Sequence, residues 1–557
     1  MFAPRAVPAR VARDGEGRQG DCLMRCINQA MRAALALLIV LSPAAAAAQS
    51  ARDTLLRSFE AHGGLDEIEA AGGATFFLDG EFDLGVRLQG QTLESEMTPM
   101  RQMIAVDTAG ERVAYDLRWR NYYQSEQDLR EVHDAEGRIL FADKRNETAQ
   151  WMPYAPVEDD QARFKRILPN FFLADALSHT PESARAGTVQ REDGPALAVT
   201  YQSAAGDPLT LFIDPETYLL SAASAPLEMP LLGAAVIQWR WSEYKEQDGL
   251  TVPGRFMSFL NGQLLSRADM ITTTDVHDRS FAAPRGIETP AAPPPGGRDD
   301  FVPYGERAPE VETIAPGVHM VRNLRPGFHP VFIEFNDFVM AVDAPAGWYE
   351  ITQIPPMNWT QGDDADALGE KFLRAIRQTA PGKPVRYLVL THHHSDHIGG
   401  LKPFVRQGAT ILAGEVAAEL ARGAIGKTGA PVALDGEADE DASGILVVRN
   451  QRTIQDMSME VRLIELPGDN PKSEGHLVVY LPDEKLLYST AFIYPVPESD
   501  FPLVESVPLS AWFVEWLDES ELEVDSLYNV HGQGRVQPWQ LQQLRALAGT
   551  EAARLIE

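Results

Sequence analysis

The sequence predicts an α+β chain: a curved antiparallel β-sheet domain with a few helices, followed by a layered domain in which strands and helices alternate. Three observations support this. Alternation of apolar and polar residues dominates up to residue 283, a segment rich in proline and glycine occupies 284–309, and short apolar strands alternate with helical patterns after residue 310. A chain of 557 residues also exceeds the usual size of one domain. The expected domains are therefore residues 49–283 and 310–557, joined by a linker at 284–309; an ordered surface loop is the alternative for that segment.

Residues 1–48 are expected to be a signal peptide region outside the fold. Arg25 and Arg32 precede the apolar run AALALLIVL, and the small-residue tract AAAAAQS follows it. A positive segment, a short apolar core and an Ala-rich exit are typical of a cleaved secretory signal. The apolar run is shorter than the ~20 residues that a membrane span requires. We therefore predict a periplasmic or secreted protein with no transmembrane segment after signal cleavage, with an N-terminal anchor helix as the alternative.

The charge and the cysteine content exclude several classes of site. Asp and Glu outnumber Lys and Arg by 80 to 49, which gives a net charge of −31 and disfavours nucleic acid as a partner. The expected partner is a small-molecule substrate, whereas the sequence does not determine the oligomeric state. The only cysteines, Cys22 and Cys26, lie in the signal region, so no disulfide and no thiolate metal ligand is expected in the exported protein.

The N-terminal half reads as a sheet with few helices. Residues 51–70 have helical spacing that breaks at Gly63-Gly64, and alternating strands begin near residue 74. The turn signal Asp214-Pro215-Glu216-Thr217 separates the strands LTLFI and YLLSA, and an amphipathic helix is expected over 164–177. Through "LFIDPETYLL" and "DGLTVPGRF" this half weakly resembles the half-barrel of periplasmic lipoprotein carriers. That resemblance implies a concave face able to hold a lipid or another apolar ligand; a scaffold or dimer contact is the favoured role.

The C-terminal half alternates strands with helices, which indicates a layered α/β arrangement. The strand signals are VFIEF, FVMAVD, RYLVL, ATILA, ILVV, MEVRLIEL, HLVVYL and KLLYS, and the helix signals lie at 368–379, at 415–421 and near Ala511 and Leu541. Residues 432–444 are acidic and small, and we expect them to form a solvated insert.

The segment LVLTHHHSDHIGG, residues 388–400, carries the strongest chemical signal. It holds four of the twelve histidines within six positions, together with Asp396, directly after an apolar strand. Imidazole and carboxylate groups suit zinc and similar divalent ions. Solvated surface histidines, the alternative, would leave the Asp and the two glycines unexplained.

The spacing H-x-H-x-D-H, followed by Ile398-Gly399-Gly400, resembles the signature of the metallo-β-lactamase fold superfamily. The resemblance covers about residues 310–557 and implies an αββα sandwich with metals at one edge of two packed sheets. It implies that His392 and His394 bind a first metal, that Asp396, His397 and His531 (in "YNVHGQG") bind a second, that His393 points away, and that Asp343 is a structural aspartate beneath the site.

Two departures from the family pattern change the expected site. Lys472 stands where the family has a third histidine for the first metal, and Ala491 stands where it has a bridging aspartate. Asp469, His329 or His476 could substitute, although each has an ordinary loop or surface interpretation. We expect one zinc ion per chain in preference to two, with other divalent metals as alternatives. The Lys472 ammonium is expected to replace the charge of the first metal.

The resulting hypothesis is an exported metal-dependent hydrolase that directs a metal-activated water at an ester, thioester, amide or lactone. Asp396 would orient the water and Lys472 would stabilise the oxyanion. The alternative is a catalytically degenerate member of the fold that serves as a binding or scaffold module. Redox chemistry on iron is a third interpretation, disfavoured because cysteine and a flavin-domain pattern are missing from the exported sequence.

Overall fold

The structure is a computed structural model, and it describes residues 50–86, 88–108, 112–120, 126–136, 138–151, 167–203, 206, 208–274, 276–292, 302–346, 365–426 and 444–550. The predicted signal region, most of the predicted 432–444 insert and residues 293–301 of the predicted linker lie outside this set. None of the described helices has the length and apolar character that crossing a membrane requires.

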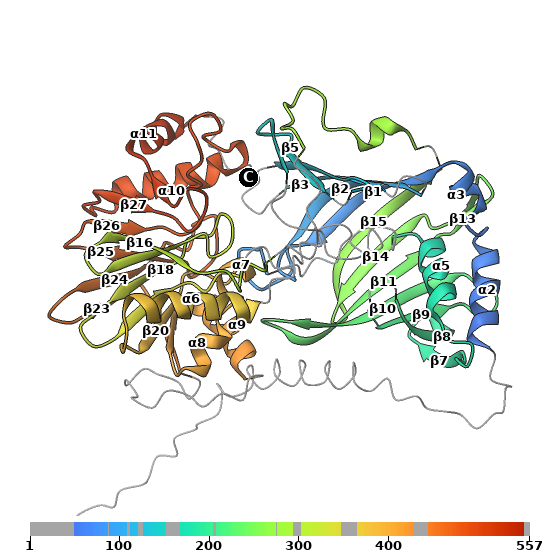
Figure 1. Cartoon of the computed structure of the whole chain (residues 1–557), viewed down its shortest axis with the longest axis horizontal. Helices are drawn as coiled ribbons and strands as arrows, with labels where there is room; N and C mark the ends of the chain where they lie inside the picture. Colours follow the sequence, from blue (N-terminus) through green and yellow to red (C-terminus); the bar gives the residue numbers. More distant parts are fainter. Residues whose placement is uncertain are drawn as a thin grey trace, which may run out of the picture. The chain divides into compact units, whose positions relative to one another are not determined.

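The first half of the chain is organised by a 13-stranded sheet with the strand order β6-β5-β4-β3-β2-β1-β15-β14-β11-β10-β9-β8-β7 (Figure 1). Its elements are α2 (Ala51–Ala61), α3 (Asp66–Ala70), β1 (Gly73–Asp83), β2 (Met97–Asp107), β3 (Arg112–Arg120), β4 (Glu126–His133), β5 (Ile139–Asp143), β6 (Thr148–Trp151), α5 (Pro169–His179), β7 (Gly187–Arg191), β8 (Gly194–Gln202), β9 (Pro208–Ile213), β10 (Leu220–Met229), β11 (Gly233–Ser242), β14 (Arg255–Leu260) and β15 (Gln263–Thr273), with the separate hairpin β12 (Lys245–Gln247) and β13 (Leu250–Val252) and a 3-10 turn at Asp278–Phe281. Neighbouring strands pair antiparallel, as in β1 with β2 and with β15.

The predicted antiparallel sheet and the helix break at Gly63-Gly64 are therefore confirmed. Residues 164–166 of the helix predicted over 164–177 lie outside the described set. Helix α5 begins at Pro169, a residue suited to the first helical turn because its missing N–H would have no partner there. Phe172 of α5 packs against Trp239 and Trp241 of β11, with ring centroids 5.7 and 5.3 Å away. The chain's own aromatic side chains thus fill this part of the sheet face. The lipoprotein-carrier resemblance stays a prediction.

The second half contains two sheets. Its elements are β16 (Glu310–Ala315), β17 (Val318–Arg322), β18 (Val331–Glu334), β19 (Val339–Val342), α6 (Ala365–Thr379), β20 (Val385–Leu390), α7 (Ser395–Ile398), α8 (Lys402–Arg406), β21 (Thr410–Ala413), α9 (Glu415–Ile425), β22 (Ile445–Val447), β23 (Gln451–Gln455), β24 (Glu460–Glu465), β25 (Leu477–Leu481), β26 (Leu486–Tyr488), a 3-10 turn at Val504–Ser506, α10 (Val507–Glu519), β27 (Ser526–Tyr528), β28 (Arg535–Val536) and α11 (Pro538–Leu547). Strands β16 to β22 form one sheet in sequence order, and strands β23 to β28 form the other.

The two sheets pack face to face and are covered by helices on their outer faces (Figure 1). Met340 and Val389 of the first sheet share a buried core with Val461 and Val479 of the second. Helices α6, α8 and α9 cover the outer face of the first sheet, and α10 and α11 cover that of the second. The four layers are the predicted αββα arrangement. Strand β20 lies between two parallel neighbours, and its residues Tyr387 to Leu390 form a buried, mostly apolar run, as expected for a central parallel strand.

Both halves belong to one compact unit, Ala48–Glu557. Direct contacts between them include two hydrogen bonds of Asn146, in the turn between β5 and β6: its side-chain amide donates to the Glu505 carboxylate, and its Oδ1 accepts the backbone N–H of Val504. The domain boundaries proposed from the sequence stay predictions.

Candidate metal centre

The histidine motif lies at the end of β20, and Asp343 anchors it there. Asp343 follows β19, the parallel neighbour of β20, and is fully buried. Its Oδ1 accepts hydrogen bonds from the backbone N–H of Thr391 (2.9 Å) and from the Thr391 hydroxyl (2.8 Å). Asp343 has φ 58, an uncommon value for a side-chain-bearing residue. The strand end and its aspartate thus fix where the chain turns from β20 into α7, the position that the family resemblance implies for Asp343.

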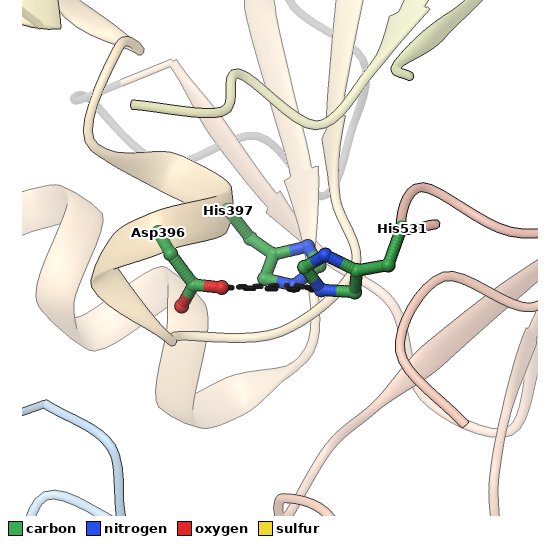
Figure 2. A group of neighbouring side chains, drawn as sticks. All are labelled: Asp396, His397 and His531. Atoms are coloured by element: carbon green, nitrogen blue, oxygen red, sulfur yellow. Dashed lines mark hydrogen bonds and ion pairs between the residues drawn. The ribbon is translucent and has the colours of Figure 1, made fainter. Parts of the chain in front are cut away.

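Three predicted ligands converge at one point. His397 Nε2 lies 3.2 Å from His531 Nε2 and 3.4 Å from Asp396 Oδ2, while His531 Nε2 lies 4.0 Å from the same oxygen. Figure 2 shows the Asp396 carboxylate directed at the two imidazole edges, with Asp396 and His397 on α7 and His531 on the segment after β27. One ligand atom from each residue falls within 4.8 Å of the others.

The donor set fits a divalent cation. The Nδ1 of His397 donates to Asp343 Oδ2 at 2.9 Å, which leaves Nε2 as a lone-pair acceptor. His531 is similarly engaged by the backbone of Gly327, and burial together with nearby positive charges holds its pKa well below the usual range. The two Nε2 atoms that face each other beside a carboxylate need a proton or a cation among them. Zinc accepts this combination of imidazole nitrogen and carboxylate oxygen.

The first-metal position has fewer ligands. His392 Nδ1 is hydrogen-bonded to the Thr391 hydroxyl at 3.1 Å, and its Nε2 has no hydrogen-bond partner among the described residues. The rings of His392 and His394 lie 4.6 Å apart, and His394 Nε2 donates to the carbonyl of Gly90 at 2.9 Å. Burial, reinforced by the neighbouring imidazoles and Lys472, holds the pKa of both residues well below the usual range. Both rings are therefore neutral, the form that a metal requires.

Lys472 belongs to the same buried cluster. The Asn470 side chain accepts the Lys472 backbone N–H at 3.1 Å and fixes the turn that carries it. Burial lowers the pKa of Lys472 to about 8, while the Asp396 carboxylate opposes that decrease. The Lys472 charge in turn lowers the pKa of His392, His394 and His531. Its ammonium thus acts on the site from within, where the resemblance places a metal ligand.

Among the described residues, the substitutes considered for the two missing ligands are not placed to bind. Ala491 is buried and has no lone pair. His476 stacks on His392, but its ring nitrogens are hydrogen-bonded to the hydroxyls of Ser473 and Thr490. His329 Nδ1 accepts the Asn323 N–H, and its Nε2 donates to the Gly532 carbonyl. Asp469 is exposed. Neither His476 nor His329 is therefore available as a ligand in this arrangement.

The site is enclosed. The side chains of His392, His394, Asp396, His397, Lys472 and His531 are all at most 4% exposed. Phe328 packs edge-on against His531 at 4.8 Å, and Tyr494 stacks on it at 4.9 Å. His393 lies against His394, with ring centroids 5.0 Å apart, and burial lowers its pKa to about 4.

Sequence reasoning missed the residues that the N-terminal half contributes. Gln89, between β1 and β2, donates its side-chain amide to Asp396 Oδ1 at 3.0 Å and to Ser395 Oγ at 3.2 Å. Gly90 supplies the carbonyl that His394 contacts. The local sequence around Gln89 has no motif, and about three hundred residues separate it from Asp396. No pattern in the sequence could have indicated this pairing.

Part of the chain matches a known protein family. Residues 362–538 match the family model of the metallo-beta-lactamase superfamily, whereas curated protein sequences give no match. Similar solved structures include a metallo-beta-lactamase from Pontibacter korlensis (18% identity, TM-score 0.30, covering 44% of this chain and 100% of that one). They also include the mono-zinc form of the metallo-beta-lactamase FIM-1 from Pseudomonas aeruginosa (16%, 0.31, 44% and 98%) and the flavodiiron protein from Giardia intestinalis (15%, 0.32, 44% and 59%). Residues 362–538 thus match the metallo-beta-lactamase superfamily, within the half of the chain that holds the four layers and the strand-end histidine motif.

Proposed function

We propose that this protein is an exported metal-dependent hydrolase that holds one zinc ion through Asp396, His397 and His531. The observation that carries the proposal is the convergence of Asp396 Oδ2 with the two Nε2 atoms, one of which is held in its acceptor form by Asp343. A zinc ion held by three protein ligands with one open position acidifies water and polarises a carbonyl group.

The chain's own residues would then divide the remaining tasks. The Asp396 carboxylate orients the attacking water and takes its proton. The Lys472 ammonium lies in the same cluster and stabilises the negative charge that develops on the carbonyl oxygen. The buried Lys472 ammonium supplies the positive charge that the first metal would supply, and it needs no metal ligands. The site therefore keeps a local positive field without the first metal and without a bridging carboxylate at Ala491. The proposed substrates are an ester, a thioester, an amide or a lactone, because all four pass through this oxyanion.

The first prediction concerns Asp396→Ala. Purified protein should contain close to one zinc per chain, and should cleave a member of a panel of chromogenic esters, thioesters, lactones and nitrocefin. Asp396→Ala should lose both the metal and at least ~10³-fold of the activity, since it removes a ligand and the group that takes the proton. The matched control is Asp337→Ala, an exposed aspartate in the turn between β18 and β19, which should behave as the wild type.

Metal content and turnover separate the possible outcomes. Two zinc ions per chain would contradict the one-metal site, and protein that remains metal-free after zinc loading would contradict the metal centre. One bound zinc without turnover of any substrate would favour the second candidate, a binding or scaffold module. The enclosure of the site by the N-terminal half favours that candidate, because a substrate must displace protein to reach Asp396. Copurified lipid without turnover would support it further.

A further inference from the structure

The segment between β1 and β2, residues 84–96, is a loop that contains several internal hydrogen bonds and contacts the candidate metal centre. Asp83 Oδ1 accepts the backbone N–H groups of Val86 (3.1 Å) and Glu96 (2.9 Å), which closes the base of the loop. The backbone N–H of Gln89 returns to the carbonyl of Leu84 at 2.9 Å. These hydrogen bonds lie within the segment and close its base.

The tip of this loop is bound to the motif over consecutive residues. The carbonyl of Leu88 accepts the backbone N–H of Ser395 at 3.3 Å, the Gln89 side chain contacts Ser395 and Asp396, and the carbonyl of Gly90 accepts from His394. Leu88 is 5% exposed within the core cluster of the C-terminal half, and its φ is 55. A bulky residue in the left-handed region costs of order 1–3 kcal/mol and persists where the surroundings enforce it.

The two oxygens of Asp396 have separate partners. Oδ1 accepts the Gln89 amide at 3.0 Å, whereas Oδ2 lies 3.4 Å from His397 Nε2 and 4.0 Å from His531 Nε2. A carboxylate can rotate about its Cβ–Cγ bond, because that torsion has no sharp staggered minima. A donor fixed on one oxygen therefore decides which way the other oxygen points.

We propose that Gln89 is a positioning residue of the metal centre: its amide holds Asp396 so that Oδ2 faces His397 and His531. The inference rests on the proposed metal site and adds that the site is completed by the N-terminal half. The Gly90 carbonyl acts in the same way on His394, since a hydrogen bond at Nε2 leaves Nδ1 as the acceptor of that ring. The N-terminal half thus contributes a side chain and a backbone carbonyl to the site.

The test measures metal affinity in the full chain with Gln89→Met, which retains the length of the side chain and removes the donor. Zinc affinity, measured by competition with a chromophoric chelator, should fall about 10–100-fold, the usual effect of losing a hydrogen bond to a metal ligand. The visible absorption of the cobalt-substituted protein should change with it. The melting temperature of the metal-free protein is measured in parallel, because the substitution also removes a hydrogen bond from the buried Asp396. Gln91→Met, an exposed position on the same loop, is the matched control and should change none of these.

The outcomes distinguish the inference from the proposed function. Equal zinc affinity and equal cobalt spectra for Gln89→Met and the wild type would overturn the role of Gln89 and leave the hydrolase proposal standing. A lower metal-free melting temperature with an unchanged cobalt spectrum would likewise overturn it, because that is the signature of a merely structural contact. If Gln89→Met loses zinc affinity and the wild type hydrolyses no substrate, the result would support the role of Gln89 and count against the hydrolase. A wild type that binds no metal would overturn both.

Discussion

His62 in the N-terminal half and His397 in the C-terminal half are both fully buried, yet their ring nitrogens have different partners. His62 Nδ1 donates to the Thr251 carbonyl at 3.0 Å, and its Nε2 accepts the Leu220 N–H at 3.0 Å. His397 has one nitrogen on the Asp343 carboxylate and the other turned towards a second imidazole and a carboxylate.

This difference separates a structural histidine from a candidate ligand. Backbone groups satisfy both nitrogens of His62, so its ring connects the end of α2 to β10 and β13 and has no acceptor left for an ion. At His397 a carboxylate fixes the tautomer and the remaining lone pair faces other acceptors, an arrangement that only a proton or a metal stabilises. Burial alone does not distinguish the two; the partners of each nitrogen do.

The largest expected effect tests the distinction between structural and ligand histidines through metal binding. His531→Ala removes one of three ligands; structural zinc sites with four ligands and apparent binding free energies of about 10–16 kcal/mol imply about 2.5–4 kcal/mol per ligand, or ~10²–10³-fold in affinity. His62→Ala should leave the zinc affinity unchanged and instead lower the free energy of unfolding, since it orphans the Leu220 N–H and the Thr251 carbonyl. Isothermal titration with zinc and urea unfolding of both variants measure the two effects. Equal loss of zinc affinity in both variants would contradict the distinction.

A somewhat smaller effect is expected on the pH dependence of stability. Burial lowers the pKa of His62 from 6.5 to about 4, so the folded state holds it neutral. The contribution of neutral His62 to the free energy of unfolding is fully present above pH 6.5. It is lost as the pH falls towards 4, because over this range the unfolded chain binds a proton that the folded chain does not. At about 1.4 kcal/mol per pH unit, the folded state should lose about 3 kcal/mol between pH 7 and pH 4.5 from this group.

The comparison variant for this effect is His62→Gln, which cannot be protonated. Urea unfolding at pH 7 and pH 4.5 should show a loss of stability in the wild type that exceeds the loss in His62→Gln by that amount. Parallel losses in the two proteins would mean that other groups carry the acid sensitivity.

The smallest expected effect sharpens the comparison within the site itself. The double variant Lys472→His with Ala491→Asp restores the two ligand types that the family pattern contains at these positions. Zinc content after loading and dialysis should rise from about one towards two per chain, with the second ion bound more weakly. Each single variant adds one ligand to His392 and His394 and should hold the second ion more weakly than the double variant does. Unchanged stoichiometry in the double variant would show that Lys472 and Ala491 do not face the first-metal position.

Much of the architecture followed from local patterns. Alternating residues predicted the antiparallel strands, the change of period after residue 310 predicted the layered half, and the resemblance at 388–400 predicted the αββα sandwich. The amphipathic pattern did not mark the start of α5, which Pro169 sets as a residue of the first helical turn. Strands β23 and β28 gave no signal that could be read, since short, partly exposed strands lack a distinctive period.

The sequence by itself determined the kinds of ligand, since four histidines and one aspartate after an apolar strand define their chemistry through residue type and spacing alone. Only the tertiary structure decided which atoms meet: His531 Nε2 faces His397 across 134 positions, and Gln89 reaches Asp396 across 307. Local periodicity reports the burial of a side chain within its own helix or strand. The partner of a side chain depends on chain folding over long separations, which no short pattern encodes.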